Sequence, residues 1–197
     1  TEISELIDGS HLYEPNIDVI DVILPEDKKQ LIISQAKNFY KFSDFMKTGR
    51  LNKSGYFKGG HIFMFEGSSG TGKTMMGNAI AKYLNKRVLL VNYPDLGNNP
   101  DEVLKFIFRE AKIHNAVIFF DECEGIFGGR DPLILTEIER YDGMIILATN
   151  RPQDLDEAMH RRISLSVHFD KPDHIQRKKI WESHLGKVDI SLSSSVD

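Results

Sequence analysis

Short runs of consecutive apolar residues recur through the middle of the chain, and each has the length of a β-strand. The runs lie at residues 61–65, 87–91, 116–120, 144–148 and 164–169. Because apolar side chains occupy successive positions rather than alternate ones, the runs predict strands that are covered on both faces. Helical patterns separate them. This alternation predicts an α/β fold in which helices cover both faces of a five-stranded parallel sheet.

Apolar positions at helical spacing predict the helices that accompany these strands. The predicted helices cover residues 26–47, 75–84, 100–111, 132–141, 155–161 and 172–185. The first helix has a wide apolar stripe that consists of Leu31, Ile32, Gln35, Ala36, Phe39, Phe42 and Met46. Residues 1–25 contain Pro15 and Pro25, and they predict an extended arm with short structured pieces.

A glycine-rich segment, residues 67–74 with the sequence GSSGTGKT, connects the strand at 61–65 to a helix. Its glycines allow the backbone N–H groups to turn inward, where they and the positive end of the helix can cradle a β-phosphate. Lys73 adds a positive charge at the β- and γ-phosphates, and the Thr74 hydroxyl is a suitable oxygen ligand for Mg²⁺. The alternative is a simple glycine-rich turn. The full spacing between a strand and a helix favours a phosphate-binding P-loop.

Two acidic residues, Asp121 and Glu122, follow the apolar strand at 116–120. We expect this strand to lie beside the P-loop strand, so that Asp121 can orient the Mg²⁺ coordination shell. Glu122 points in another direction and can polarise the water that attacks the γ-phosphorus. The alternative is that both acids only cap the next turn.

Asn150 follows the strand at 144–148, where its side chain can reach the attacking water or the γ-phosphate. The local sequence Asn-Arg-Pro is equally typical of a turn. Arg161 and Arg162 come at the end of the short helix at 155–161. Three interpretations stay open for them: solvated surface charge, contact with an anionic polymer, or an arginine finger that neutralises γ-phosphate charge in the transition state.

The composition limits the class of protein. Of the 197 residues, 41% are apolar and 27% are charged, as in ordinary globular domains, and the net charge of −4 gives no reason to expect nucleic acid as a partner. No apolar run approaches the ~20 residues that span a bilayer, and residues 1–10 lack the pattern of a signal peptide. The single cysteine, Cys123, excludes an internal disulfide framework and suits a reducing compartment, so we expect a cytoplasmic protein.

In this order, the motifs resemble the ATPase module of the AAA clade within the AAA+ superfamily, and the resemblance covers about residues 15–185. Residues 67–74 resemble Walker A, and residues 117–122 resemble Walker B. Residues 146–152 resemble the sensor 1 strand, and residues 155–162 resemble the segment that ends in paired arginine fingers.

The resemblance implies ATP as the nucleotide, Mg²⁺ as the metal ion, and a P-loop NTPase fold with five parallel strands. The residues implied to bind the nucleotide are Ser68, Ser69, Gly70, Thr71, Gly72, Lys73, Thr74, Met75 and Asp121, with Lys73 and Thr74 at the phosphates. Thr74 and Asp121 would bind Mg²⁺. The adenine base would pack near Asp21, Val22 and Ile23.

The resemblance also implies roles in hydrolysis. Glu122 would be the catalytic base, and Asn150 would be sensor 1. Arg161 and Arg162 would act on the nucleotide of the neighbouring subunit, which implies a homo-oligomeric ring, expected to be a hexamer, with active sites at the subunit interfaces.

Some segments depart from the family pattern. Ser68 and Ser69 stand where many relatives have two prolines, which should leave phosphate binding intact. The connections near Gly97 and Arg130 are shorter than the two loops that face a central pore in relatives. We consider two explanations: the protein lacks these loops, or it has them and this sequence omits part of them, in which case a polypeptide can still be threaded.

The resemblance divides the chain into an N-terminal arm at 1–25, a large α/β ATPase subdomain at 26–171, and a last helix with the start of a helical lid at 172–197. With only the beginning of a lid, we expect weaker nucleotide binding than in a complete module. The favoured function is an ATP-driven ring motor that remodels or unfolds a protein substrate. The alternatives are a nucleic-acid-directed ATPase of the helicase-loader type, which should have a basic groove and a salt-dependent affinity, and a nucleotide-gated scaffold.

Overall fold

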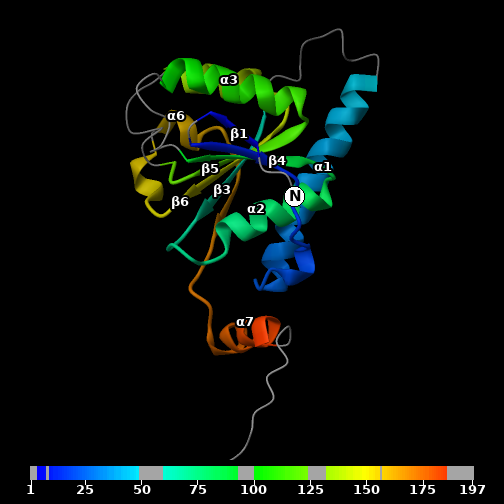
Figure 1. Ribbon diagram of the computed structural model, residues 1–197, viewed down its shortest axis with the longest axis vertical. Coiled ribbons are helices and arrows are strands. Elements are labelled where there is room, and N and C mark those ends of the chain that lie inside the picture. Colours follow the sequence, from blue (N-terminus) through cyan, green and yellow to red (C-terminus); the bar gives the residue numbers. More distant parts are fainter. Residues whose placement is uncertain are drawn as a thin grey trace, which may run out of the picture.

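A single mixed sheet forms the centre of the computed structural model, which describes residues 4–7, 9–48, 60–92, 100–123, 132–155 and 157–185 (Figure 1). Within these residues the sheet has seven strands in the order β1-β2-β4-β5-β6-β3-β7. The strands are β1 (Ser4–Ile7), β2 (Ser10–Tyr13), β3 (His61–Glu66), β4 (Arg87–Asn92), β5 (Ala116–Asp121), β6 (Met144–Thr149) and β7 (Ile163–His168).

Five neighbouring strands, β4, β5, β6, β3 and β7, pair in parallel, which confirms the predicted parallel sheet. β6 lies between β5 and β3, so the prediction that the strand ending in Asp121 lies beside the P-loop strand was wrong. The apolar pattern marks buried strands but carries no information about their order, because neighbours in a parallel sheet need not follow one another in sequence.

The N-terminal arm contains short structured pieces, as predicted, but two of them are strands of the sheet, which the sequence did not indicate. β1 and β2 form an antiparallel hairpin, and β2 pairs antiparallel with β4. Leu12 of β2 is buried in the core beside Leu89. Each of these strands has only four residues, which is too short for a period-two pattern to distinguish them from an irregular arm.

Helices cover both faces of the parallel strands, as Figure 1 shows for α3 on one side and α1 and α2 on the other. They are α1 (Glu26–Thr48), α2 (Lys73–Tyr83), α3 (Pro100–Ile113), α5 (Pro132–Arg140), α6 (Glu157–His160) and α7 (His174–Leu185), with 3₁₀ turns at Val19–Asp21 and Pro152–Asp154. Two buried clusters result. One joins α3 and α5 to one face of the sheet, and the other joins α1 and α2 to the opposite face.

The buried stripe of α1 is narrower in the structure than the apolar residues of this helix predicted. Ile32, Ala36 and Phe39 are buried, whereas Leu31 and Phe42 are exposed. A helix that packs on one side buries residues along one line at spacings of three and four, so apolar residues on the adjacent line stay in solvent.

β7 also differs from the expectation of strands that are apolar on both faces. It is the last strand of the sheet, and Ser164, Ser166 and His168 are exposed while Val167 is buried. An edge strand covered on one face shows this alternation.

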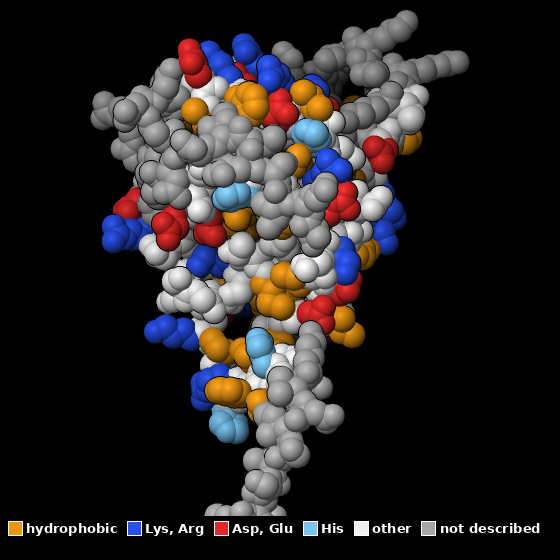
Figure 2. All heavy atoms as spheres, viewed as in Figure 1, with side chains coloured by type: hydrophobic (Ala, Val, Ile, Leu, Met, Phe, Trp, Pro, Cys, Tyr) orange, Lys and Arg blue, Asp and Glu red, His pale blue; other side chains and the backbone are white. Residues whose placement is uncertain are grey.

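α7 lies at one end of the molecule, apart from the helices that cover the sheet (Figure 1). Apolar side chains gather over this region in Figure 2, and Ile175, Trp181 and Leu185 of α7 are exposed. The connections near Gly97 and Arg130, and the expected lid beyond residue 185, lie outside the described residues. Among the residues that are described, none of the helices combines the length and the apolar character needed to cross a membrane.

Candidate nucleotide-binding site

The P-loop connects the carboxyl end of β3 to α2, in the strand–loop–helix context that the sequence predicted. Gly67, Gly70 and Gly72 have φ angles of 143°, 75° and 97°. These are backbone conformations that side-chain-bearing residues rarely adopt, which explains why glycines stand at these positions. The N–H of Gly67 donates to the carbonyl oxygen of Thr149 at 3.1 Å, so the loop is tied to the end of β6.

The side chain of Lys73 lies inside the P-loop. It is buried, and its Nζ donates to the carbonyl oxygens of Gly67 at 2.8 Å and Ser68 at 2.9 Å. The Thr71 hydroxyl donates to the same Ser68 carbonyl at 2.9 Å. These contacts hold an ammonium group beside the start of α2, whose backbone N–H groups and helix dipole also favour an anion.

The two predicted Mg²⁺ ligands meet. The Thr74 hydroxyl donates to Oδ2 of Asp121 at 3.0 Å, although β6 separates the strands that lead to these residues. The contact is possible because α2 packs closely on β5. A Cβ atom added to Gly77 of α2 would lie 2.3 Å from the ring of Phe119, so only glycine permits this approach.

The pair of a hydroxyl and a carboxylate fits a magnesium ion, which prefers one or two protein oxygens together with phosphate oxygens and water. In the part of the chain that the structure describes, no group of three or more histidine, cysteine or acidic side chains could hold a metal ion by itself. One hydroxyl and one carboxylate suit an ion that also takes phosphate oxygens and water as ligands.

Glu122 is exposed and has a φ angle of 51°, in the left-handed region that residues other than glycine seldom adopt. Its N–H donates to Oδ1 of Asp121 at 3.1 Å, and Cys123 then returns to the sheet by donating to the carbonyl oxygen of Ala148 at 3.2 Å. Unusual backbone at the end of a strand is often associated with function.

Asn150 is exposed and directly follows β6. Thr149 pairs with Glu66 in the parallel register, so Asn150 lies at the same sheet edge as the first residue of the P-loop. The turn that follows is fixed by a hydrogen bond from the Arg151 N–H to the Thr149 hydroxyl at 2.9 Å.

Arg161 and Arg162 lie away from the P-loop of their own chain. They precede β7, and Ile163 pairs with Ile62 near the start of β3, whereas the P-loop follows the other end of β3. Five to six residues of strand separate the two ends, which corresponds to about 20 Å. Arg161 is exposed and pairs with Glu157 of the preceding helix α6, and Arg162 pairs with Glu139 of α5.

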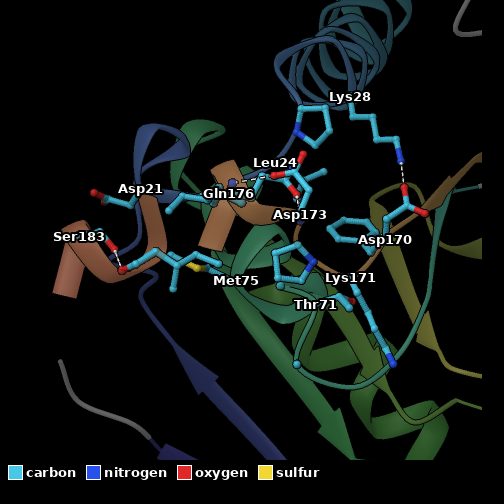
Figure 3. A pocket seen from close by; sticks show the side chains of 18 of the residues that line it. Asp21, Leu24, Lys28, Thr71, Met75, Asp170, Lys171, Asp173, Gln176 and Ser183 are labelled. Carbon is cyan, nitrogen blue, oxygen red and sulfur yellow. Dashed lines mark hydrogen bonds and ion pairs between the residues drawn. The ribbon is translucent and has the colours of Figure 1, made fainter. Parts of the chain in front are cut away.

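A cavity of about 350 Å³ opens beside the P-loop (Figure 3). The predicted adenine-site residues Asp21, Val22 and Ile23 line it, together with Gly70, Thr71, Gly72 and Met75. The structure thus brings the N-terminal arm and the phosphate loop to one pocket. Val22 is buried, whereas Asp21 is exposed at the pocket rim.

The other pocket walls were not identified from the sequence. They come from the start of α1, from the connection between β7 and α7, and from α7, and include Leu24, Pro25, Lys28, Asp170, Lys171, Asp173, Gln176, Ile180, Ser183 and His184. These side chains look like ordinary surface or helix residues in the sequence. Only the return of the chain to the P-loop after β7 reveals them, and no local motif encodes that return.

Residues 63–171, more than half of the chain, match the model of the ATPase family associated with various cellular activities (AAA). The chain is 30% identical over 157 residues to a 26S proteasome regulatory subunit 4 homolog of Encephalitozoon cuniculi, a match that covers 66% of this chain and 37% of the relative. It is 27% identical over 194 residues to a cell division cycle protein 48 homolog of Archaeoglobus fulgidus, which covers 87% of this chain and 26% of that protein. The chain thus spans well under half the length of these relatives.

A solved structure described as the structural basis for katanin self-assembly shares the fold, with a TM-score of 0.69 and 25% identity. The likeness covers 87% of this chain and 59% of the katanin chain. This share is larger than the part of the chain that matches the family model.

Proposed function

Because the chain belongs to the AAA family of ATPases, we propose that it hydrolyses ATP in a ring of identical subunits and uses the energy to remodel a protein substrate. The observation that carries the proposal is the hydrogen bond of 3.0 Å between Thr74 and Asp121. Thr74 follows the buried Lys73 in the chain, and Gly72 and Met75 line a cavity of about 350 Å³. Groups for the phosphates, for a metal ion and for a base therefore lie together, at the carboxyl ends of the strands where ligands bind in such sheets.

Binding of the nucleotide follows from these groups. The P-loop N–H groups and Lys73 would hold the phosphates, and the base would enter the cavity against Val22 and Met75. Thr74 and Asp121 would hold Mg²⁺, which, when bound, neutralises phosphate charge.

We assign hydrolysis to side chains at the same sheet edge. Glu122 would accept a proton from the water whose oxygen attacks the γ-phosphorus, while the bond to the β–γ bridging oxygen breaks and ADP leaves with the electron pair. Asn150 would hold that water or a γ-phosphate oxygen. Both side chains are exposed, so a water molecule can reach them.

The position of Arg161 and Arg162 supports action in trans. They lie at the opposite end of the sheet from their own P-loop, so they can complete a site only on another subunit. Katanin, whose solved structure has a similar fold, is described as self-assembling. We further propose a hexameric ring, and a cytoplasmic location on the basis of the single cysteine.

The test is the ATPase rate per subunit over a range of protein concentrations. The rate should rise cooperatively, and Glu122→Gln and Arg161→Ala should each lower it about 10²-fold or more at every concentration. Arg109→Ala is the control, because Arg109 is an exposed arginine of α3 that pairs with the adjacent Glu110.

A second experiment shows whether the two substituted residues act in one site that two subunits share. Mixing Glu122→Gln subunits with Arg161→Ala subunits should restore some activity, since one kind keeps the arginine and the other keeps the base. A rate that is flat with concentration and unaffected by Arg161→Ala would contradict the ring motor, and it would favour a monomeric or nucleic-acid-activated ATPase.

A further inference from the structure

The connection between β7 and α7, residues 169–173, lines the nucleotide cavity, and we name it the linker. It joins the sheet that carries the P-loop to the helix that forms the outer wall of the cavity. The orientation of α7 over the cavity therefore depends on what holds the linker in place.

On one side the linker contacts the P-loop. The N–H of Phe169 donates to the carbonyl oxygen of Glu66 at 2.7 Å, and Phe169 is buried. A Cβ atom added to Gly67 would lie 2.3 Å from the carbonyl oxygen of Phe169. The first glycine of the P-loop and the first residue of the linker are thus in backbone contact.

On the other side Lys28 of α1 holds the linker (Figure 3). Its Nζ donates to the carbonyl oxygen of His168 at 2.8 Å and to Oδ2 of Asp170 at 2.7 Å. The other carboxylate oxygen of Asp170 lies 3.4 Å from Nε2 of His168. The second ring nitrogen of His168, Nδ1, lies 3.7 Å from the carboxylate of Glu66. The neighbouring ammonium of Lys28 lowers the pKa of Asp170, so this carboxylate stays charged near neutral pH.

The end of the linker is joined rigidly to α7. The N–H of Asp173 donates to the Gln176 side chain at 2.9 Å, and the N–H of Gln176 donates to the Asp173 carboxylate at 2.8 Å. This reciprocal pair is a capping box, which fixes the entry of the chain into the helix. Gln176, Ile180 and His184 of the same helix face the cavity.

We propose that Lys28 is a positioning residue for the nucleotide: by binding His168 and Asp170 it ties α1 to the linker and so holds α7 over the base. The inference rests on the proposed function, since it concerns the same cavity. Lys28 lies 140 residues from His168 in the sequence. It lines the cavity together with residues 22–25 and with side chains of α7.

The experiment measures the dissociation constant of ADP and, separately, that of inorganic triphosphate for the intact protein. Lys28→Met and Asp170→Asn should each weaken ADP about three- to tenfold, the range of a partly exposed ion pair with an added hydrogen bond. The double variant should be no weaker than the worse single one, because both remove the same contact. Inorganic triphosphate, which needs only the P-loop, should bind each variant as it binds the wild type.

Lys28→Arg should recover most of the ADP affinity, and Lys37→Met, at an exposed position of the same helix, is the control. Thermal unfolding of each variant without nucleotide shows whether the fold is intact. The proposal is overturned if both substitutions leave ADP binding unchanged. It is also overturned if Lys28→Met weakens triphosphate while Asp170→Asn tightens ADP, because Lys28 would then contact phosphate directly. If the wild type binds neither ligand, the proposed function itself fails.

Discussion

At the scale of single residues, His61 is a partly buried histidine with one buried ring nitrogen that lacks a hydrogen-bond partner among the described residues. Its ring stacks on Phe39 with centroids 4.7 Å apart, and Phe63 approaches at 5.1 Å. Nε2 is buried and has no hydrogen-bond partner among the described residues. Removal from water lowers the pKa of His61 below its ordinary value of 6.5, because burial disfavours the charged ring.

This lowered pKa predicts a loss of stability in mild acid. Below pH 6.5 the His61 ring is protonated in the unfolded chain but stays neutral in the folded chain. The free energy of unfolding therefore falls as the pH falls toward the folded pKa. At pH values well above 6.5, His61 is neutral in both states and does not make the free energy of unfolding depend on pH. One such group adds at most about 1.4 kcal/mol per pH unit.

The measurement is urea unfolding between pH 7.5 and pH 5. His61→Phe should reduce the pH dependence, and His174→Gln, at an exposed position of α7, controls for the loss of a histidine. An unchanged slope in His61→Phe would show that other groups carry the acid sensitivity.

The sequence predicted the site residues that belong to local motifs. Thr74 of the P-loop lies beside Asp121 as expected, but for a different reason: their strands are not neighbours, and the packing of α2 on β5 brings the two side chains together. The roles assigned to Glu122, Asn150, Arg161 and Arg162 stay predictions. Lys28 could not be found from the sequence, because its partners lie 140 residues or more away and a lysine in an exposed helix pattern carries no signal of its own.

At the scale of elements, the packing of α2 on β5 determines whether the two candidate Mg²⁺ ligands meet. Gly77 lies against the ring of Phe119, two residues before Asp121. Helix propensity alone predicts that Gly77→Ala stabilises the protein by about 1 kcal/mol. The close contact predicts the opposite.

We expect Gly77→Ala to lower the free energy of unfolding by about 1–3 kcal/mol, as overpacking does in well-filled cores. The measurement is chemical denaturation of four proteins: the wild type, Gly77→Ala, Phe119→Leu and the double variant. The double variant should lose less than the sum of the single losses, because the smaller side chain relieves the contact. If Gly77→Ala raised the free energy of unfolding, the prediction would be wrong, because α2 and β5 could then move apart without destabilising the fold.

The element pattern of the sheet was predictable where burial is complete. β3, β5 and β6 are almost fully buried, and apolar runs mark them clearly. The hairpin of β1 and β2 was missed because backbone pairing with β4, rather than a long apolar run, places it in the sheet. The order of the strands could not be predicted either, because the apolar pattern does not show which strands are neighbours. Asp121 meets Thr74 because α2 packs on β5.

At the scale of the whole molecule, the predicted family and fold class are confirmed by the AAA match and by the likeness to katanin. The ring, its substrate and the use of Mg²⁺ stay proposals, because they depend on surfaces between subunits and on ligands. The walls of the cavity come from three segments that are far apart in the sequence, within residues 21–28, 70–75 and 169–184. A nucleotide that fills this cavity therefore joins the arm, the P-loop and α7.

This arrangement predicts that nucleotide stabilises the whole fold and that Mg²⁺ acts mainly through the nucleotide. ADP at 100 times its dissociation constant adds about 2.7 kcal/mol, which for a chain of this size corresponds to a rise in Tm of about 5–10 °C. Chelation of Mg²⁺ with EDTA should reduce the rise, because the ion that we propose Thr74 and Asp121 hold would then no longer neutralise phosphate charge.

Thermal unfolding with ADP, with Mg²⁺ and with both tests this linkage. Thr74→Ala should make the effect of ADP independent of Mg²⁺, whereas Thr71→Ala, in the same loop but bonded to Ser68, should keep the dependence. Mg²⁺ alone should change Tm little, since one hydroxyl and one carboxylate are too few ligands to hold the ion against water. A large shift with Mg²⁺ alone, retained in Thr74→Ala, would mean that the ion binds elsewhere and that the contact between Thr74 and Asp121 serves only the fold.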